Sequence, residues 1–172
     1  MKNWYMMALV GKDQPGIVAQ ITEALFKAGG SLGETSMMRL GSNFTIMMMV
    51  EMDGDEKQLC QTVHPVTEEL GLHLHVDKIE PGLHQHSIPD LRVVVYGADR
   101  PGIVAQVTGV LAESGFDITD LDSQVGGAAE KPIYILMIEG IAGAGVDAVH
   151  RALEPLSESI DFRVEEIETL IG

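Results

Sequence analysis

The residues best suited to chemistry in this 172-residue chain stand in a ten-residue stretch that occurs twice. It reads DQPGIVAQIT over residues 13–22 and DRPGIVAQVT over residues 99–108. An aspartate beside the start of a helix can take an ammonium group, and the free N–H groups of the first helical turn can donate to a carboxylate. A free α-amino acid carries both groups. The stretch therefore offers the chemistry of an amino-acid site.

The candidate binding residues are the first five of each copy. They are Asp13, Gln14, Pro15, Gly16 and Ile17 in the first copy, and Asp99, Arg100, Pro101, Gly102 and Ile103 in the second. A purely structural interpretation is also available. Each aspartate would then accept hydrogen bonds from the first N–H groups of its helix, each proline would occupy the first helical turn, and each glycine would only permit a tight turn. On these residues alone both interpretations stay open.

The two copies reveal how the whole chain is organised. They are offset by 86 residues, half of the chain, and differ at only two of ten positions, which indicates an internal duplication. Each copy follows an apolar run, at residues 5–10 and 91–96, and then continues with apolar residues at helical spacing. The stretch is therefore predicted to be a tight turn from a strand into a helix, and Gly29 and Gly115 are predicted to close the two helices.

The same element order is predicted in both repeats. In the first, strands are expected at 2–10, 31–40, 44–52 and 72–79, and helices from the turn to about residue 28 and at 56–70. In the second, strands are expected at 91–96, 116–125, 132–139 and 160–167, with helices at 102–114 and 146–156 and a loop at 126–131. Pro65 is a misfit in its helix and is expected to kink it.

This order predicts an α+β fold made of two ferredoxin-like βαββαβ units. Each unit would be a four-stranded antiparallel sheet with two helices on one face. The predicted domains are residues 1–80 and 91–172, joined by a linker over 81–90 that begins with Pro-Gly and has a proline near its end. Because one face of each small sheet stays open, we expect the repeats to pair and the chains to form a homodimer.

Composition excludes several classes of protein. The net charge is −15 with no cluster of Lys or Arg, so direct nucleic-acid binding is not expected. The single cysteine, Cys60, excludes an internal disulfide and fits a reducing compartment. No signal peptide and no apolar run of about 18 residues is present, so a cytoplasmic protein without membrane contact is expected. No catalytic triad and no phosphate loop is found, so neither an enzyme nor a cofactor is predicted.

Three further clusters have a functional and a structural interpretation. The aspartates within residues 117–122 could hold a cation, although a solvated strand edge explains them as well. The His-x-His pairs at 73–75 and 84–86 could chelate zinc or nickel, but no further ligand stands at a convincing spacing. Methionines at 37–38 and 47–49 are interpreted as core and interface residues of a hairpin.

A family resemblance adds to these observations. The D-x-P-G-I-V turn, with KAGGSL at residues 27–32 and ESGFDI at 113–118 leading into a strand, resembles the ACT domain. Two such units in one chain of this length resemble the glycine cleavage system transcriptional repressor family. The resemblance implies small-molecule binding near the first turn, at an interface between two units. It also implies that the protein acts through a transcription-factor partner and does not itself bind DNA.

The resulting hypothesis is a non-catalytic regulatory protein. It would sense a small molecule, an amino acid such as glycine, and control transcription through a protein partner. One alternative is a protein-interaction module that binds no ligand. The other is a metal sensor that uses the His-x-His pairs.

Overall fold

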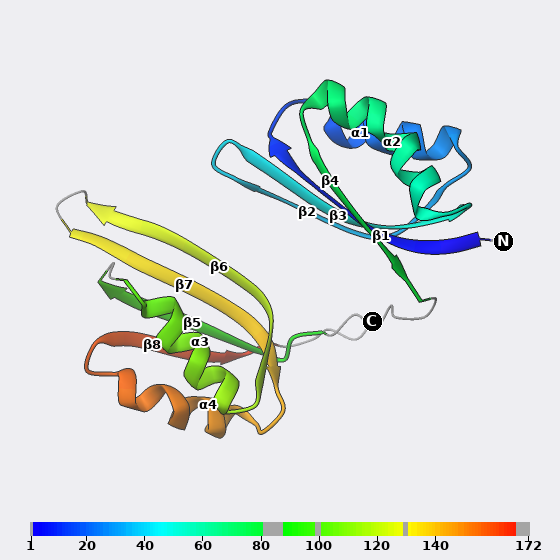
Figure 1. Cartoon of the computed structure of the whole chain (residues 1–172). Helices are drawn as coiled ribbons and strands as arrows, with labels where there is room; N and C mark the ends of the chain where they lie inside the picture. Colours follow the sequence, from blue (N-terminus) through cyan, green and yellow to red (C-terminus); the bar gives the residue numbers. More distant parts are fainter. Residues whose placement is uncertain (1, 81–87, 99–100, 129–130, 168–172) are drawn as a thin grey trace. The chain divides into compact units, whose positions relative to one another are not determined.

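The chain divides into two compact units, residues 1–85 and 86–172 (Figure 1). The computed structural model describes residues 2–80, 88–98, 101–128 and 131–167. The predicted linker at 81–90 lies mostly outside this range, and so do Asp99, Arg100, His84 and His86. Within the described residues, no helix is long and apolar enough to cross a membrane.

Unit 1 has the predicted order of elements. They are β1 (Lys2–Lys12), α1 (Ile17–Lys27), β2 (Ser31–Leu40), β3 (Asn43–Asp53), α2 (Glu56–Leu70) and β4 (His73–Ile79). The strands form an antiparallel sheet in the order β2-β3-β1-β4, and both helices lie on the same face of it (Figure 1). The predicted ferredoxin-like unit is confirmed, with Pro65 inside α2.

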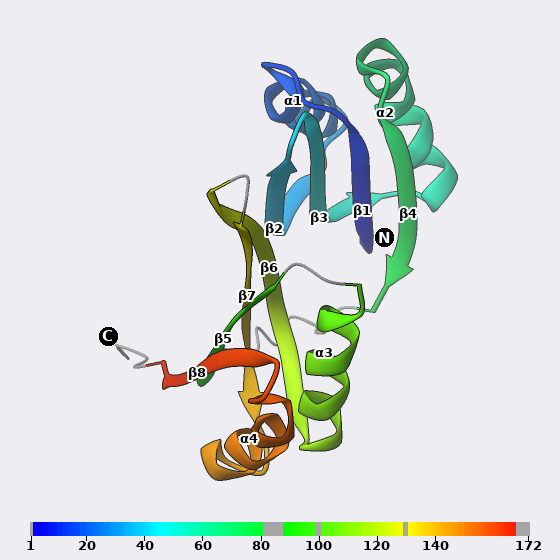
Figure 2. The same cartoon turned by 90° about the vertical axis from the view of Figure 1, so that its left-hand side faces the viewer.

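Unit 2 repeats this arrangement. Its elements are β5 (Leu91–Ala98), α3 (Ile103–Glu113), β6 (Phe116–Ala128), β7 (Lys131–Ala142), α4 (Val146–Leu153), a 3-10 turn (Glu154–Leu156) and β8 (Ile160–Glu166). The antiparallel strand order is β6-β7-β5-β8 (Figure 1), which is the unit 1 order β2-β3-β1-β4 (Figure 2) with each strand replaced by its counterpart. The duplication read from the sequence is therefore a duplication of the fold.

Each unit has its own core between the sheet and the two helices. The helical apolar residues at matching positions of the repeats are buried: Ile17, Ile21 and Leu25 in α1, and Ile103, Val107 and Leu111 in α3. They pack against the inward side of the central strands, where alternate residues are buried. Apolar residues at helical spacing in α1 and α3, and alternating buried residues in the central strands, thus form the core of each unit. The turn between strand and helix lies at the edge of that core.

Two predicted boundaries in unit 2 are wrong. The expected loop at 126–131 is largely strand, because antiparallel pairing continues through Gly126, opposite Ile133, and on to Ala128, opposite Lys131. Cross-strand backbone hydrogen bonds do not require a side chain, so glycines within the pair did not end it. The last helix ends at Leu153, three residues early, and Pro155 lies in the 3-10 turn that follows.

The last residues of the strand before each turn pack closely against core side chains. A Cβ atom added at Gly97 would lie 2.9 Å from Cδ1 of Ile103 and 3.3 Å from Cγ2 of Ile160. At the matching position of unit 1, a Cβ atom added at Gly11 would lie 2.6 Å from Cδ2 of Leu72. Both glycines let the end of a central strand pack directly against the core residues that follow. The turns therefore start from equivalent, tightly packed points.

Candidate functional site

The turn of unit 1 leaves the helix start without a side-chain cap. Gly16 is the N-cap of α1 with φ 90° and ψ 0°, in the left-handed region, and no side chain caps the helix. The Gly16 carbonyl accepts the first helical hydrogen bond from the Gln20 N–H at 3.0 Å. Pro15 and Gly16 are exposed, whereas Ile17 is buried in the core. The first N–H groups of α1 thus lie at an exposed turn, where a ligand carboxylate could accept from them.

Unit 2 builds the same turn. Gly102 is the N-cap of α3 with φ 89° and ψ −2°, again without a side-chain cap from the described residues, and its carbonyl accepts from the Gln106 N–H at 2.9 Å. Pro101 is exposed and Ile103 is buried. Since the dihedral angles agree within two degrees, the two copies of the motif specify one backbone conformation.

The expected capping role of Asp13 is wrong. The helix starts at Gly16, so Asp13 stands three residues before the N-cap, whereas capping side chains act from the N-cap itself. Its carboxylate Oδ2 instead lies 2.6 Å from Nη2 of Arg39 on β2, and its backbone N–H donates to the Ser42 carbonyl at 2.9 Å. Asp13 therefore joins the β1–α1 turn to the β2–β3 hairpin, and Arg39 is a neighbour that the motif did not indicate.

The remaining turn residues of unit 1 also have defined positions. The Nε2 group of Gln14 donates to the Leu70 carbonyl at 2.8 Å, which ties the turn to the end of α2. Pro15 precedes the N-cap and lies outside the first helical turn where it was expected. Its ring fixes φ immediately before the glycine, so Pro15 and Gly16 together set the direction in which the chain enters α1.

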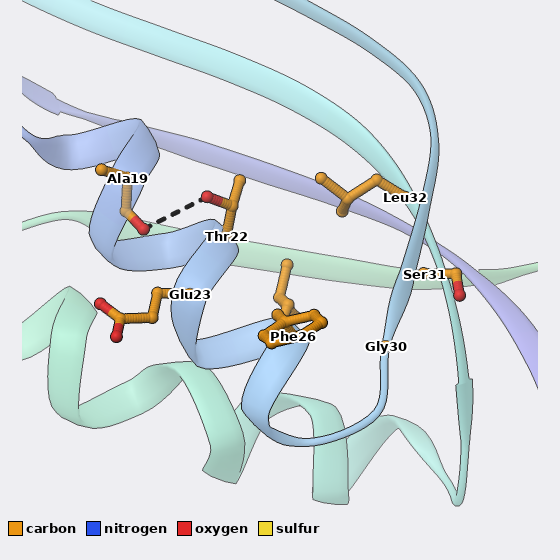
Figure 3. A pocket seen from close by; sticks show the side chains of 8 residues that line it. Ala19, Thr22, Glu23, Phe26, Gly30, Ser31 and Leu32 are labelled. Atoms are coloured by element: carbon orange, nitrogen blue, oxygen red, sulfur yellow. Dashed lines mark hydrogen bonds between the residues drawn. The ribbon is translucent and has the colours of Figure 1, made fainter.

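An open groove lies beside the same helix. It has a volume of about 700 Å³ and runs between the outer side of α1 and the start of β2. Figure 3 shows the groove, with Phe26 and Leu32 at its sides and the Thr22 hydroxyl donating to the Ala19 carbonyl at 3.2 Å. Phe26 is 79% exposed, and every residue of the edge strand β2 is exposed. The groove adds apolar surface next to a helix whose N-terminus is the candidate site.

The other clusters have surface positions. Asp120 and Asp122 lie on the same face of β6, as expected, opposite Glu139 and Met137 of β7. His75 contacts Asp77 at 2.8 Å, with both side chains well exposed. Among the described residues no group of three or more His, Cys, Asp or Glu side chains could hold a metal ion. Neither cluster therefore offers a built cation site in the part of the chain that the structure describes.

The methionines of β3 alternate between core and surface as expected, whereas Met37 and Met38 on β2 are both exposed. Met48 is buried at 1% exposure, whereas Met47 next to it on β3 is 51% exposed. Met38 and Leu40, on the edge strand β2, are also more than half exposed. The Met47 and Met38 side chains lie on the sheet face that the helices leave open, since Thr45, two residues from Met47, pairs with Met38.

Two solved structures have a fold similar to that of this chain. Among solved structures, a protein of unknown function from Galdieria sulphuraria is similar over 98% of this chain and 100% of its own, with a TM-score of 0.73 and 22% identity. A candidate glycine cleavage system transcriptional repressor is similar over 98% of this chain and 99% of its own, with a TM-score of 0.71 and 17% identity. No curated protein sequence matches. The two structures share the tandem fold over essentially the whole chain.

Comparison with family models gives both units of the chain the same class of domain. Models of the ACT domain match residues 6–77 and residues 91–155, which together are most of the chain. The chain therefore belongs to the ACT domain family. ACT domains are regulatory and generally bind small ligands, amino acids among them.

Proposed function

We propose that this protein is a non-catalytic sensor that binds an α-amino acid, such as glycine, at its β1–α1 or β5–α3 turn. The observation that carries the proposal is the pair of matching turns, in which Gly16 and Gly102 are N-caps and no side chain of the described residues caps either helix. Such N-termini favour a carboxylate through their N–H groups and the helix dipole. In unit 1 the Asp13 carboxylate stands before the same turn and suits an ammonium group.

The proposed output is control of transcription through a protein partner. A net charge of −15 opposes binding to a phosphate backbone, so the regulated step would be reached through another protein. Exposed apolar side chains on the open face and edge of the first sheet, among them Met38, Leu40 and Met47, offer an adaptable contact surface. We further propose that the chain acts in the cytoplasm as a homodimer. Light scattering at micromolar concentration tests the dimer, because it measures the mass of the particle in solution.

Calorimetric titration with each of the twenty amino acids, run with and without a chelator, tests the sensor. We expect at least one amino acid to bind in both conditions. Binding only without chelator would favour a metal sensor, and no binding at all would favour a pure interaction module. In a parallel gel-shift assay the isolated protein should leave DNA unshifted at physiological salt, and a shift with a steep salt dependence would contradict the proposed output.

A substitution of Asp13 tests the proposed amino-acid site more directly. Asp13→Asn keeps the size of the side chain and removes the charge that would hold the ammonium group. We expect it to weaken binding by about 1.5–3 kcal/mol, the scale of a hydrogen bond to a charged group. Asp77→Asn, which removes the same charge from an exposed position on β4, is the matched control and should bind like the parent.

A further inference from the structure

The ion pair between Asp13 and Arg39 joins two segments that are distant in sequence. Arg39 stands near the end of β2, and its guanidinium Nη2 lies 2.6 Å from the Asp13 carboxylate. The Asp13 N–H also donates to the carbonyl of Ser42 in the β2–β3 turn. The hairpin therefore presents a cation to the turn that starts α1. Both charges are reachable, since the side chains are 64% exposed for Arg39 and 23% exposed for Asp13.

The chemistry of this pair matches that of a zwitterion. A guanidinium binds a carboxylate through two parallel N–H donors, and a carboxylate binds an ammonium group. The guanidinium side of the pair is open to water, which screens the attraction and keeps its contribution to stability small. An α-amino acid can therefore exchange its own two charges for the two partners of the pair, and each charged group of the protein keeps an opposite charge beside it.

The register of the sheets shows that this arginine belongs to unit 1 alone. Gly11 pairs with Phe44, and Phe44 pairs with Arg39 across the hairpin. In unit 2, Gly97 pairs with Tyr134, and Tyr134 pairs with Val125. Val125 thus stands where unit 1 has Arg39, so an uncharged residue occupies this register position in unit 2. The duplicated turns are alike in backbone and differ in what the neighbouring hairpin presents to them.

We propose that Arg39 is a specificity-determining residue of unit 1 that binds the carboxylate of an α-amino acid whose ammonium group binds Asp13. This inference rests on the proposed amino-acid sensing. It adds Arg39 as the partner of the ligand carboxylate and unit 1 as the unit that binds the ligand. It predicts that unit 1 distinguishes an amino acid from its amide, because only the free acid carries the charge that Arg39 binds. The first N–H groups of α1 then orient the bound ligand.

Titration of the full chain with the twenty amino acids tests the inference. The amino acid that binds most tightly is then compared with its amide, in which the α-carboxylate is replaced by an uncharged carboxamide. In the parent, the free acid should bind at least tenfold more tightly than its amide. Arg39→Gln should weaken binding of the acid at least tenfold and leave binding of the amide nearly unchanged. Arg39→Lys, which keeps the charge, should recover part of the loss. Arg151→Gln removes the same charge from an exposed position on α4 and should match the parent.

The outcomes separate this inference from the sensor itself. If the parent binds an amino acid and Arg39→Gln binds it equally well, the role of Arg39 is refuted and the sensor stands. An equal loss for the acid and the amide would also refute it, since Arg39 would then act on the fold and not on the carboxylate. If the parent binds none of the twenty amino acids, the proposed function fails and this inference fails with it.

Discussion

Replacing Gly102 by alanine isolates the cost of the left-handed turn. The residue has φ 89°, and a Cβ atom there would meet no atom of the described residues within 4 Å, so no steric clash with them contributes. The remaining cost is that of an L-residue in a left-handed conformation, about 1–2 kcal/mol. Gly102→Ala is therefore expected to lower the free energy of unfolding of unit 2 by that amount.

Gly109 provides the matched control in the same helix. It lies inside α3, outside the left-handed region, and its added Cβ atom would also meet nothing within 4 Å. Alanine is better than glycine in a helix by about 0.5–1 kcal/mol, because the unfolded chain loses less entropy on folding. The same substitution seven residues further on should thus raise stability. The two variants should differ by about 1.5–3 kcal/mol, the sum of the two effects.

Thermal and urea unfolding of the full chain, followed by circular dichroism, measures the difference. For a unit of this size each kcal/mol corresponds to about 4–8 °C in Tm. The reasoning is refuted if Gly102→Ala is as stable as the parent or as Gly109→Ala, because the turn would then not need its glycine. The same backbone cost applies at Gly16, so a bulky residue there would disturb the fold together with any ligand site.

Three further variants or measurements test the packing of the units. Asp55→Ala removes the N-cap side chain that accepts from the backbone N–H three residues on in α2, and should cost about 1 kcal/mol in chemical denaturation, whereas no loss would contradict the capping box. Gly97→Ala should cost about 1–3 kcal/mol because its Cβ atom would overlap Ile103, and an unchanged Tm would show that the strand end is not tightly packed. The pKa of the Cys60 thiol is raised, mainly by burial and to a smaller extent by the nearby Glu56 charge. Alkylation of Cys60 at pH 8–9 should therefore be slower in the folded protein than in the unfolded chain, and equal rates would contradict this.

The sequence alone was sufficient to predict the fold of both units. A near-identical stretch at a half-chain offset identified the duplication, and helical spacing after an alternating strand identified each element. The boundary errors came where the side-chain pattern is weak. Around Gly126 the strands are held by backbone pairing with a distant segment, and no local residue preference reports such pairing.

The candidate site was only partly predictable. The turn glycines were identified, but their role as left-handed N-caps, which moves Asp13 away from the helix start, depends on a backbone conformation that the sequence did not reveal. Arg39 was missed because its link to Asp13 arises from the hairpin register and not from proximity in the sequence. The 86-residue offset already matches Arg39 to Val125, but the registers are needed to show that this position lies beside the turn.

The central claim, that amino acids bind at the glycine turns, is tested most directly by ¹⁵N-resolved NMR of the full chain. Glycine amides occupy a distinct region of the spectrum, so Gly16 and Gly102 can be followed during titration with the twenty amino acids. The account predicts that the binding amino acid shifts the amide signals of Gly16 and Ile17, or of Gly102 and Ile103, in proportion to its occupancy. An amino acid that binds by calorimetry while these four signals stay in place would contradict the account and put the sensing site elsewhere.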